Sequence, residues 1–310
     1  MLDFNSVYQE KIIPAIEPLE IDRKCVMRLY IISYLIVALA AGGFYIATQK
    51  IEVAIMSVAT MSWVITRITR SKLKSFRGNF KSNIIQSIVT SYNPDWEYSP
   101  QSGIHQDVFK DSRIFLTKID RYHSEDLIDG GLGDTDFHFS EVHAESAGSD
   151  NGSNYNTIFK GIFFRADFNK HFNGTTVVLP DMAEKAFGFL GKFLQKHNFR
   201  KEDLVNMEDP VFEKAFVVYG TDQVEARYIL SPALMKRFTD FKNALGSKFY
   251  ASFDGFHINI ALPFKKDFFE PAIWSTLYQP ARYKEFFTEL DFFTSIVEEM
   301  NLNTRIWTKD

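Results

Sequence analysis

Cysteine is scarce in this sequence of 310 residues, and positive charge is not in excess over negative charge. The one cysteine, Cys25, excludes an intramolecular disulfide and a zinc site built from cysteine thiolates, so nothing requires an oxidising compartment. The formal net charge is -4 and the pI is near 6.0, which gives no overall attraction to nucleic acid. A disulfide scaffold is thereby excluded, and no nucleic-acid partner is expected.

Motifs of the common catalytic classes are also missing. The sequence has no serine-nucleophile motif, no phosphate-binding loop and no zinc-protease helix signature. The glycine-rich stretch DGGLGD, residues 129–134, lacks the Lys-Ser/Thr pair and the following helix of a phosphate loop, so it predicts a hairpin turn. We therefore expect no cofactor and no resident metal.

Charge is absent from one long segment. Residues 29–48 contain no charged side chain, and a helix of that length rises about 30 Å, the thickness of the hydrocarbon layer of a bilayer. Residues 51–68 are again apolar except near their ends. One helix over both stretches would be nearly twice too long, so the chain must turn at residues 48–50. The pattern predicts a two-helix transmembrane hairpin over residues 25–68.

Lysine and arginine flank this hairpin on one side. Basic residues precede the first span and follow the second, whereas the turn carries Lys50 alone: Arg23, Lys24 and Arg28 before, and Arg67, Arg70, Lys72, Lys74, Arg77 and Lys81 after. Because positive residues stay on the cytoplasmic side, both termini are expected there. A cleaved signal peptide fits poorly, since the apolar stretch is too long and a second one follows at once.

Two other interpretations of the apolar segments remain. They could be a pair of buried helices inside a soluble domain, although helices that are apolar on every face are rare outside membranes and very large cores. Alternatively, only the first span crosses and the main body lies outside. The basic cluster that follows the second span argues against this topology.

The segments beside the hairpin are amphipathic or basic. Residues 1–24 predict a cytoplasmic amphipathic lead-in interrupted by Pro14 and Pro18. Residues 69–92 predict a basic juxtamembrane helix, whose cations either meet anionic headgroups or form a solvated face. Within the first span, the small residues 40–43 (Ala40, Ala41, Gly42 and Gly43) would permit close helix approach, so the hairpin could form a homo-oligomer.

Residues 93–310 alternate strand and helix patterns and predict a cytoplasmic α+β region, with a mixed, mainly antiparallel sheet and packed helices; the patterns leave open whether it is one domain or two. Strands are expected at 134–146, 156–168 and 175–180, and the first two should form an antiparallel hairpin. A further hairpin is expected around Asp254-Gly255. Capping residues predict helix starts at Asp181 (with Glu184), Asp209-Pro210 and Ser231-Pro232.

The last helix is expected to begin near Pro280. Its apolar residues recur at three- and four-residue steps, and we interpret this stripe as core rather than as a partner-binding face: Tyr283, Phe286, Phe287, Leu290, Phe293, Val297 and Met300.

The stretch EVHAE supplies the first candidate site. On a strand, Glu141, His143 and Glu145 would project from one face, and two carboxylates with an imidazole could hold a divalent cation. Such side chains stand about 7 Å apart on a flat strand, which is too far to converge on one ion without a bulge. We therefore favour a solvent-facing strand.

A second candidate lies in ADFNKHF, where Asp167, Lys170 and His171 could form a polar cluster at a strand end. Asp167 and His171 could act in acid–base chemistry. However, the need for turn-forming residues before Asn173-Gly174 already explains this composition.

A third candidate is VYGTDQVEARYILSP, residues 218–232. Thr221 or Asp222 could cap a short helix, although alternating apolar residues also permit a strand. In either case, we interpret Glu225 and Arg227 as polar ties between packed elements rather than as catalytic groups.

Several of these stretches together resemble a known family. EVHAE, FKGIFFRADFNKHF (159–172), VVLPD (177–181) and DPVFEKAFVVYGTDQVEARYILSP (209–232) follow in the order typical of a bacterial membrane-anchored family of unknown function, whose members often carry the automatic label "galanin". The resemblance implies a multi-pass protein of the bacterial inner membrane and supplies no catalytic residues. Members are often encoded beside LemA-type membrane proteins, which implies such a protein as a partner.

Two hypotheses of function follow. The first is a membrane-anchored interaction or assembly module with a cytoplasmic domain. The alternative is a membrane-tethered enzyme, a hydrolase or a metal-dependent enzyme, that uses Glu141, His143, Asp167 or His171. The enzyme hypothesis requires at least three of these four side chains to converge on one substrate.

Overall fold

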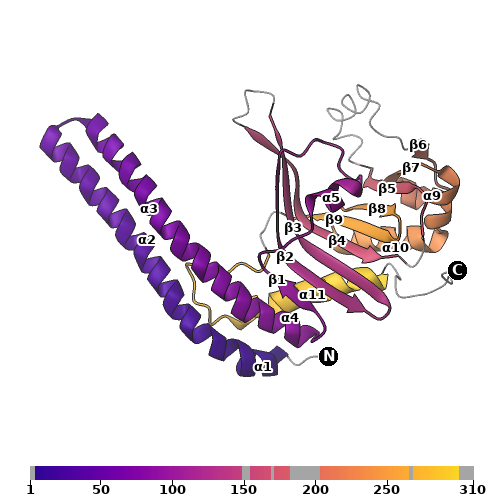
Figure 1. Cartoon of the computed structure of the whole chain (residues 1–310), viewed down its shortest axis with the longest axis horizontal. Coiled ribbons are helices and arrows are strands. Elements are labelled where there is room, and N and C mark those ends of the chain that lie inside the picture. Colours follow the sequence, from indigo (N-terminus) through magenta and orange to yellow (C-terminus); the bar gives the residue numbers. More distant parts are fainter. Residues whose placement is uncertain (1–3, 149–153, 169–170, 182–202, 265–267, 300–310) are drawn as a thin grey trace. The chain divides into compact units, whose positions relative to one another are not determined.

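The computed structural model describes residues 4–148, 154–168, 171–181, 203–264 and 268–299. The chain divides into two compact units, and Figure 1 shows their elements. We call Met1–Pro94 with Phe269–Thr288 the helical unit, and Asp95–Phe268 with Glu289–Asp310 the sheet unit.

The helical unit contains two long antiparallel helical runs. The first run comprises α1 (Phe4–Val7), the π-helical η1 (Tyr8–Ile12) and α2 (Ile13–Thr48), and the second comprises α3 (Ile51–Phe80), the π-helical η2 (Lys81–Ile85) and α4 (Gln86–Tyr92). α2 and α3 pack side by side as a hairpin (Figure 1). Gln49 ends α2 in the left-handed region at φ 56°, so the turn lies where the change from apolar to polar residues predicts it.

The sequence predicts an interruption at Pro14 and Pro18, but the helix continues through both prolines. Pro14 stands in the first turn of α2, directly after the π-helical η1 in one continuous run, so its missing N–H also removes a helical hydrogen bond. Pro18 lies inside α2 and removes one hydrogen bond. The helix continues because Ile16 and Leu19, on either side of Pro18, are buried within the unit.

The sheet unit is built on nine strands in the order β1-β2-β3-β4-β9-β8-β5-β7-β6. Every pairing among the described residues is antiparallel. The strands are β1 (Glu97–Ser99), β2 (Arg121–Leu132), β3 (Thr135–Ala147), β4 (Tyr155–Asp167), β5 (Thr175–Pro180), β6 (Asp203–Val205), β7 (Phe216–Gly220), β8 (Tyr250–Asp254) and β9 (His257–Pro263). The predicted α+β class is confirmed.

Helices cover both faces of this sheet. They are α5 (Gln106–Asp111), α8 (Pro210–Glu213), α9 (Gln223–Ile229), α10 (Pro232–Leu245) and the part of α11 (Pro280–Glu299) that follows Thr288. Pro280–Thr288 itself belongs to the helical unit. Because side chains alternate along a strand, neighbouring phenylalanines of β4 serve opposite cores. Phe163 packs against Phe109 of α5, whereas Phe164 packs beside Phe139, which contacts Phe293 of α11.

Most local predictions are confirmed. The hairpin turns fall at Gly133, with φ 64°, and at Gly255, with φ 52°, both in the left-handed region that glycine tolerates. Asp209 and Ser231 each accept hydrogen bonds from backbone N–H groups at a helix start. The helix expected after Asp181 lies outside the described residues. The apolar stripe of α11 is buried from Tyr283 to Val297, which confirms its role as core.

Candidate functional site

A row of polar side chains crosses four strands of the sheet unit on one face. The strand register places His138 opposite Arg165, Arg165 opposite Asn259 and Asn259 opposite Ser252. One step along the strands, Asp167 lies opposite His257 and His257 opposite Asp254. We call these residues the Arg165 cluster: His138, Arg165, Asp167, Ser252, Asp254, His257 and Asn259.

Arg165 is the centre of this cluster. Its Nη1 donates to Asn259 Oδ1 at 3.1 Å, and its Nη2 donates to His257 Nδ1 at 2.8 Å and lies 3.5 Å from Asp254 Oδ1. Because Nδ1 of His257 accepts this hydrogen bond, the imidazole proton resides on Nε2. This Nε2 lies 3.7 Å from Asp167 Oδ1, which is too long for a hydrogen bond.

Burial and the arginine together set the charges of the cluster. Burial, followed by the positive charge of Arg165, lowers the pKa of His257 and lowers that of His138 to about 4. Burial raises the pKa of Asp254, although Arg165 opposes this effect. Both imidazoles are therefore neutral at pH 7, and the arginine is the cation of the cluster.

This arrangement ties strands together more clearly than it prepares a reaction. Ser252, the hydroxyl of the cluster, is fully buried and accepts from Asn259 Nδ2 at 3.2 Å, so it is not placed as a nucleophile. Asp167 and His257 are partly exposed, with side chains 41% and 32% exposed, and they could exchange a proton with a ligand. Asp167 was a candidate from the sequence. His257 and Arg165 were missed because their partners lie on other strands.

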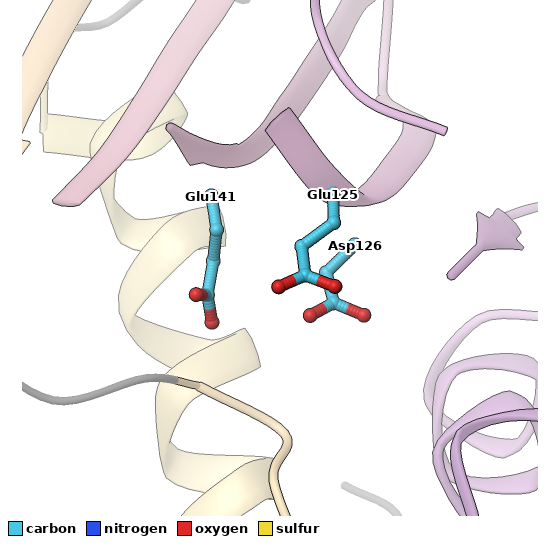
Figure 2. Close-up of side chains that lie close together, drawn as sticks. All are labelled: Glu125, Asp126 and Glu141. Atoms are coloured by element: carbon cyan, nitrogen blue, oxygen red, sulfur yellow. The ribbon is translucent and has the colours of Figure 1, made fainter. Parts of the chain in front are cut away.

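Three carboxylates converge at a second place in the sheet unit (Figure 2). Glu125 of β2 lies opposite Glu141 of β3, and the register shifts between Glu125 and Ile128, where Asp126 has a φ of 59°. This bulge brings carboxylate oxygens of Glu125, Asp126 and Glu141 within 4.8 Å of one another. Oxygen atoms are the ligands that Ca²⁺ and Mg²⁺ prefer, so these residues could hold a divalent cation.

Protein donors already serve two of these carboxylates. The hydroxyl of Tyr98 donates to Asp126, and the backbone N–H of Phe268 donates to Glu141. Asp126 and Tyr98 are both buried, which makes this hydrogen bond costly to lose. The three members of the metal set considered for EVHAE do not converge: His143 Nε2 lies 3.8 Å from Glu145 Oε1, but Glu141 lies with Glu125 and Asp126.

The four residues of the enzyme hypothesis have different partners. Glu141 lies with Glu125 and Asp126, whereas His143 lies beside Glu145 and Thr157. Asp167 faces His257, and the ring of His171 packs on Phe256 at a centroid distance of 4.5 Å. The contacts of the described residues therefore bring no three of the four together. Lys170 lies outside the described residues.

The segment around Glu225 connects neighbouring elements of the sheet unit. Asp222 accepts from the N–H groups of Val224 and Glu225, so α9 forms and the alternative strand interpretation is wrong. The Glu225 carboxylate accepts from the N–H groups of Asn173 and Gly174 at 2.9 and 2.8 Å. Arg227 is exposed and reaches its two partners, Asn206 O and Gln223 Oε1, only at 3.4 Å. Of the two expected ties, Glu225 is the effective one.

An extended apolar surface lies on the helical unit. The helical runs Phe4–Thr48 and Ile51–Tyr92 are each long and apolar enough, by length and composition, to cross a membrane. Their large apolar side chains are exposed over residues 31–64: Ile31, Ile32, Tyr34, Leu35, Ile36, Leu39, Phe44, Tyr45, Ile46, Ile51, Ile55, Met56, Trp63 and Val64. A Cβ added at Gly42 or Gly43 would meet no described heavy atom within 4 Å, so these glycines do not serve the packing of α2 on α3.

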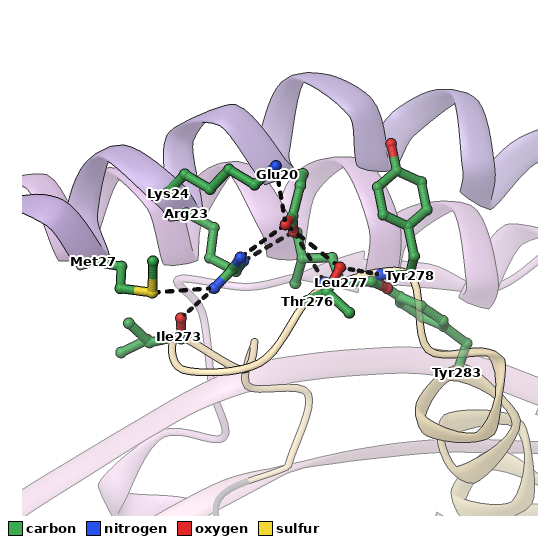
Figure 3. A network of polar contacts seen from close by, with 9 residues as sticks. All are labelled: Glu20, Arg23, Lys24, Met27, Ile273, Thr276, Leu277, Tyr278 and Tyr283. Atoms are coloured by element: carbon green, nitrogen blue, oxygen red, sulfur yellow. Dashed lines mark hydrogen bonds and ion pairs between the residues drawn. The ribbon is translucent and has the colours of Figure 1, made fainter.

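Part of the basic flank of this surface is neutralised by ion pairs. Arg77 and the buried Lys81 both contact the carboxylate of Glu270, at 3.0 and 3.1 Å. Arg23 is buried against Glu20 at 2.8 Å, as Figure 3 shows. These three cations therefore hold the helical unit together, and the exposed basic residues are left to meet a headgroup or water.

Comparison with known proteins agrees with a domain of unknown function. Residues 157–302 match the family described as "Protein of unknown function (DUF3137)". No curated protein matches the chain. The crystal structure of the mycobacterial trehalose monomycolate transport factor A, TtfA, is similar at 11% sequence identity and a TM-score of 0.32, over 68% of this chain and 92% of that chain.

Proposed function

We propose that this chain is a membrane-anchored interaction or assembly module of the bacterial inner membrane. In this proposal the α2–α3 hairpin spans the bilayer, and both termini and the sheet unit are cytoplasmic. The observation that carries the proposal is the continuous apolar surface of α2 and α3, where Leu39 is 75% exposed and Ile46 72% exposed.

Water is a poor solvent for such a surface. Each fully exposed Leu, Ile or Phe side chain forgoes about 1.5–3 kcal/mol of burial free energy, and soluble proteins seldom expose large contiguous apolar patches. A bilayer removes this cost because its hydrocarbon layer, roughly 30 Å thick, matches the uncharged stretch 29–48 of α2. The apolar stretch of α3 is shorter between Glu52 and Arg67, and these end charges can reach the headgroups. The buried-helix alternative loses support, since these side chains are not covered in the fold.

The proposed orientation is supported by the exposed cations. Arg28, Arg67 and Arg70 are exposed at the end of the hairpin opposite its turn, whereas Lys50 is the basic residue of the turn. This asymmetry favours retention of the basic end in the cytoplasm.

The role as a module is supported by the nature of the polar clusters. The Arg165 cluster and Glu225 join strands and turns within the sheet unit, and the enzyme candidates do not share contacts. The resemblance to a family whose members are encoded beside LemA-type proteins makes such a membrane protein the first partner to test.

Two experiments test the anchor. The full-length protein should stay in the membrane pellet after alkaline carbonate washing, and it should need detergent for extraction. A reporter that is active only in the periplasm should be silent when fused at the C-terminus and active when inserted at Gln49. A monodisperse full-length protein in the supernatant without detergent would refute the anchor, and a C-terminal reporter with strong activity would refute the orientation.

A third experiment tests the module. Affinity purification from gently solubilised membranes should recover a specific membrane protein with the parent chain. A chimaera that carries an unrelated two-helix anchor in place of residues 29–66 should recover the same partner if the sheet unit binds it. Recovery of no specific protein by the parent chain would count against the module.

A further inference from the structure

Trp274 is an exposed aromatic residue of the helical unit that extends the surface of α2. Its side chain belongs to the irregular segment before α11 and is 64% exposed. Its ring lies 6.0 Å from that of Tyr30 on α2, and Tyr30 in turn stacks on Tyr34 at 6.5 Å. Tyr34 is itself 67% exposed within the apolar surface of the hairpin. Three aromatic rings therefore form a continuous row from the Trp274 segment onto the apolar surface.

A network of buried polar contacts holds this segment on α2 (Figure 3). Arg23 Nη1 donates to the carbonyl of Ile273 at 2.8 Å, directly before Trp274 in the chain. The Glu20 carboxylate accepts from the N–H of Leu277 at 3.0 Å, and the buried Tyr283 hydroxyl donates to the Leu277 carbonyl at 2.8 Å. The backbone on both sides of Trp274 is thus tied down, so the exposed position of its side chain is built into the unit.

The position of Trp274 along the hairpin coincides with the edge of the hydrocarbon layer. Tyr30, its ring partner, precedes the end of α2 at Thr48 by about 18 positions, which places it about 27 Å from the turn. Thr69 lies equally far from Ile51 on the antiparallel α3. The hydrocarbon layer is about 30 Å thick, so when the turn lies at one interface, Tyr30 and Trp274 lie at the other.

Exposed cations lie at about the same distance from the turn as Tyr30 and Trp274. Arg28 precedes Tyr30 by two residues on α2, and Arg67 and Arg70 flank Thr69 on α3. Guanidinium groups favour the phosphate level of a bilayer, whereas tryptophan and tyrosine favour the interface just beneath it. Trp274 thus has the amphipathic side chain that this level favours.

We infer that the Ile273–Tyr278 segment is a third membrane contact, with the indole of Trp274 in the headgroup–acyl boundary of the cytoplasmic leaflet. The inference rests on the proposed membrane anchor and extends it to a segment more than 200 residues away in the sequence. The occupant of this surface is lipid because the aromatic row is continuous with the apolar surface of the hairpin.

Tryptophan fluorescence tests the inference in the full chain. The chain has four tryptophans, and Trp96 is buried in the sheet unit, so it can be kept as a constant background. One reporter keeps Trp274 and replaces Trp63 and Trp307 with Phe. A matched reporter keeps Trp63 and replaces Trp274 and Trp307, and a third variant keeps Trp96 alone. Each is reconstituted into phosphatidylethanolamine–phosphatidylglycerol vesicles, after circular dichroism has confirmed the parent fold.

Lipids brominated near the headgroup or deep in the acyl chain then report depth. Trp274 should lose more intensity with the shallow quencher than with the deep one, and it should be protected from aqueous iodide relative to the same variant in detergent-free urea. Trp63 lies about 9 Å nearer the turn, so it should respond more strongly than Trp274 to the deep quencher. The background variant should respond weakly to both lipids.

The two reporters separate failure of the inference from failure of the anchor. If bromolipids quench Trp63 but not Trp274, and aqueous iodide quenches Trp274, the inference is wrong and the anchor is retained. Absence of bromolipid quenching at both positions would overturn the anchor, and the inference with it.

Discussion

The Oε2 atom of Glu225 accepts a hydrogen bond from the backbone N–H of Gly174 at 2.8 Å. Glu225 belongs to α9, and Gly174 lies directly before β5, so this contact ties a helix to the start of a strand. A Cβ at residue 174 would lie 2.2 Å from Thr221 Oγ1, which explains the glycine. The dense polar stretch around Glu225 therefore closes a corner of the sheet unit.

Glu225→Ala should destabilise the sheet unit. The variant removes an acceptor that serves two backbone donors, and a charged hydrogen bond contributes about 1.5–3 kcal/mol. We expect a loss of about 2 kcal/mol in the free energy of unfolding, measured by urea denaturation in mild detergent. Arg227→Ala is the matched control and should cost less than about 0.5 kcal/mol, since its contacts are exposed and long. Equal losses in the two variants would contradict this assignment.

Removal of Arg23 should be more harmful than removal of the whole Glu20–Arg23 pair. Arg23→Met leaves a buried carboxylate without its partner, at a cost of about 3–5 kcal/mol. In Glu20→Gln/Arg23→Met no buried charge remains, so the loss should be smaller. Lys24→Met is the control, because Lys24 is exposed and lies 3.8 Å from Glu20. The thermal unfolding of these three variants and of Glu20→Gln in detergent gives the comparison; an additive double variant would refute the coupling.

The Glu20–Arg23 pair should make the stability of the helical unit sensitive to acid. The hydrogen bond from Arg23 lowers the pKa of Glu20 below its ordinary value of 4.5. The stabilisation is therefore complete at a pH above that ordinary pKa, and it is lost as the pH falls through the lower pKa that Glu20 has in the folded chain. Thermal unfolding of the parent chain should show this loss at acid pH, whereas Glu20→Gln should show a shallower dependence. Parallel profiles would contradict the role of Glu20.

Tyr98→Phe should destabilise the sheet unit through Asp126. The hydroxyl of Tyr98 donates to a buried carboxylate, and loss of one donor to such a group costs about 1–3 kcal/mol. Tyr122→Phe is the control, since its hydroxyl donates at 2.8 Å to the neutral carbonyl of Ile104 and should contribute about 1 kcal/mol. Urea denaturation should rank Tyr98→Phe as the more harmful variant, and the reverse order would refute the expectation.

Histidines of the Arg165 cluster should weaken the sheet unit at acid pH. The pKa of His138 is lowered to about 4 and that of His257 is also lowered, so the unfolded chain takes up protons at a higher pH than the folded chain. Stability is then complete above the ordinary histidine pKa of 6.5 and falls as the pH drops toward about 4. Between about pH 7 and pH 5, His138→Gln should reduce the slope of the free energy of unfolding against pH, measured by urea denaturation. The exposed His123→Gln should leave it unchanged, and equal slopes in both variants would contradict the assignment.

The sequence by itself determined the features that depend on neighbouring residues. Twenty uncharged positions followed by a polar turn predict the hairpin of α2 and α3, because helix rise and bilayer thickness are fixed lengths. Asp209, Asp222 and Ser231 predict helix starts because a capping side chain serves N–H groups two or three residues away. The pattern of α11 likewise predicts its buried stripe.

Only the tertiary structure decided which distant residues meet. Glu141 pairs with a bulge on β2, Arg165 gathers partners from β9 and β8, and Trp274 reaches Tyr30. The cost of closing a loop grows only slowly with its length, so separation in the chain does not select one partner over another. Strand order and packing make that choice, and a pattern of local spacings carries no record of it.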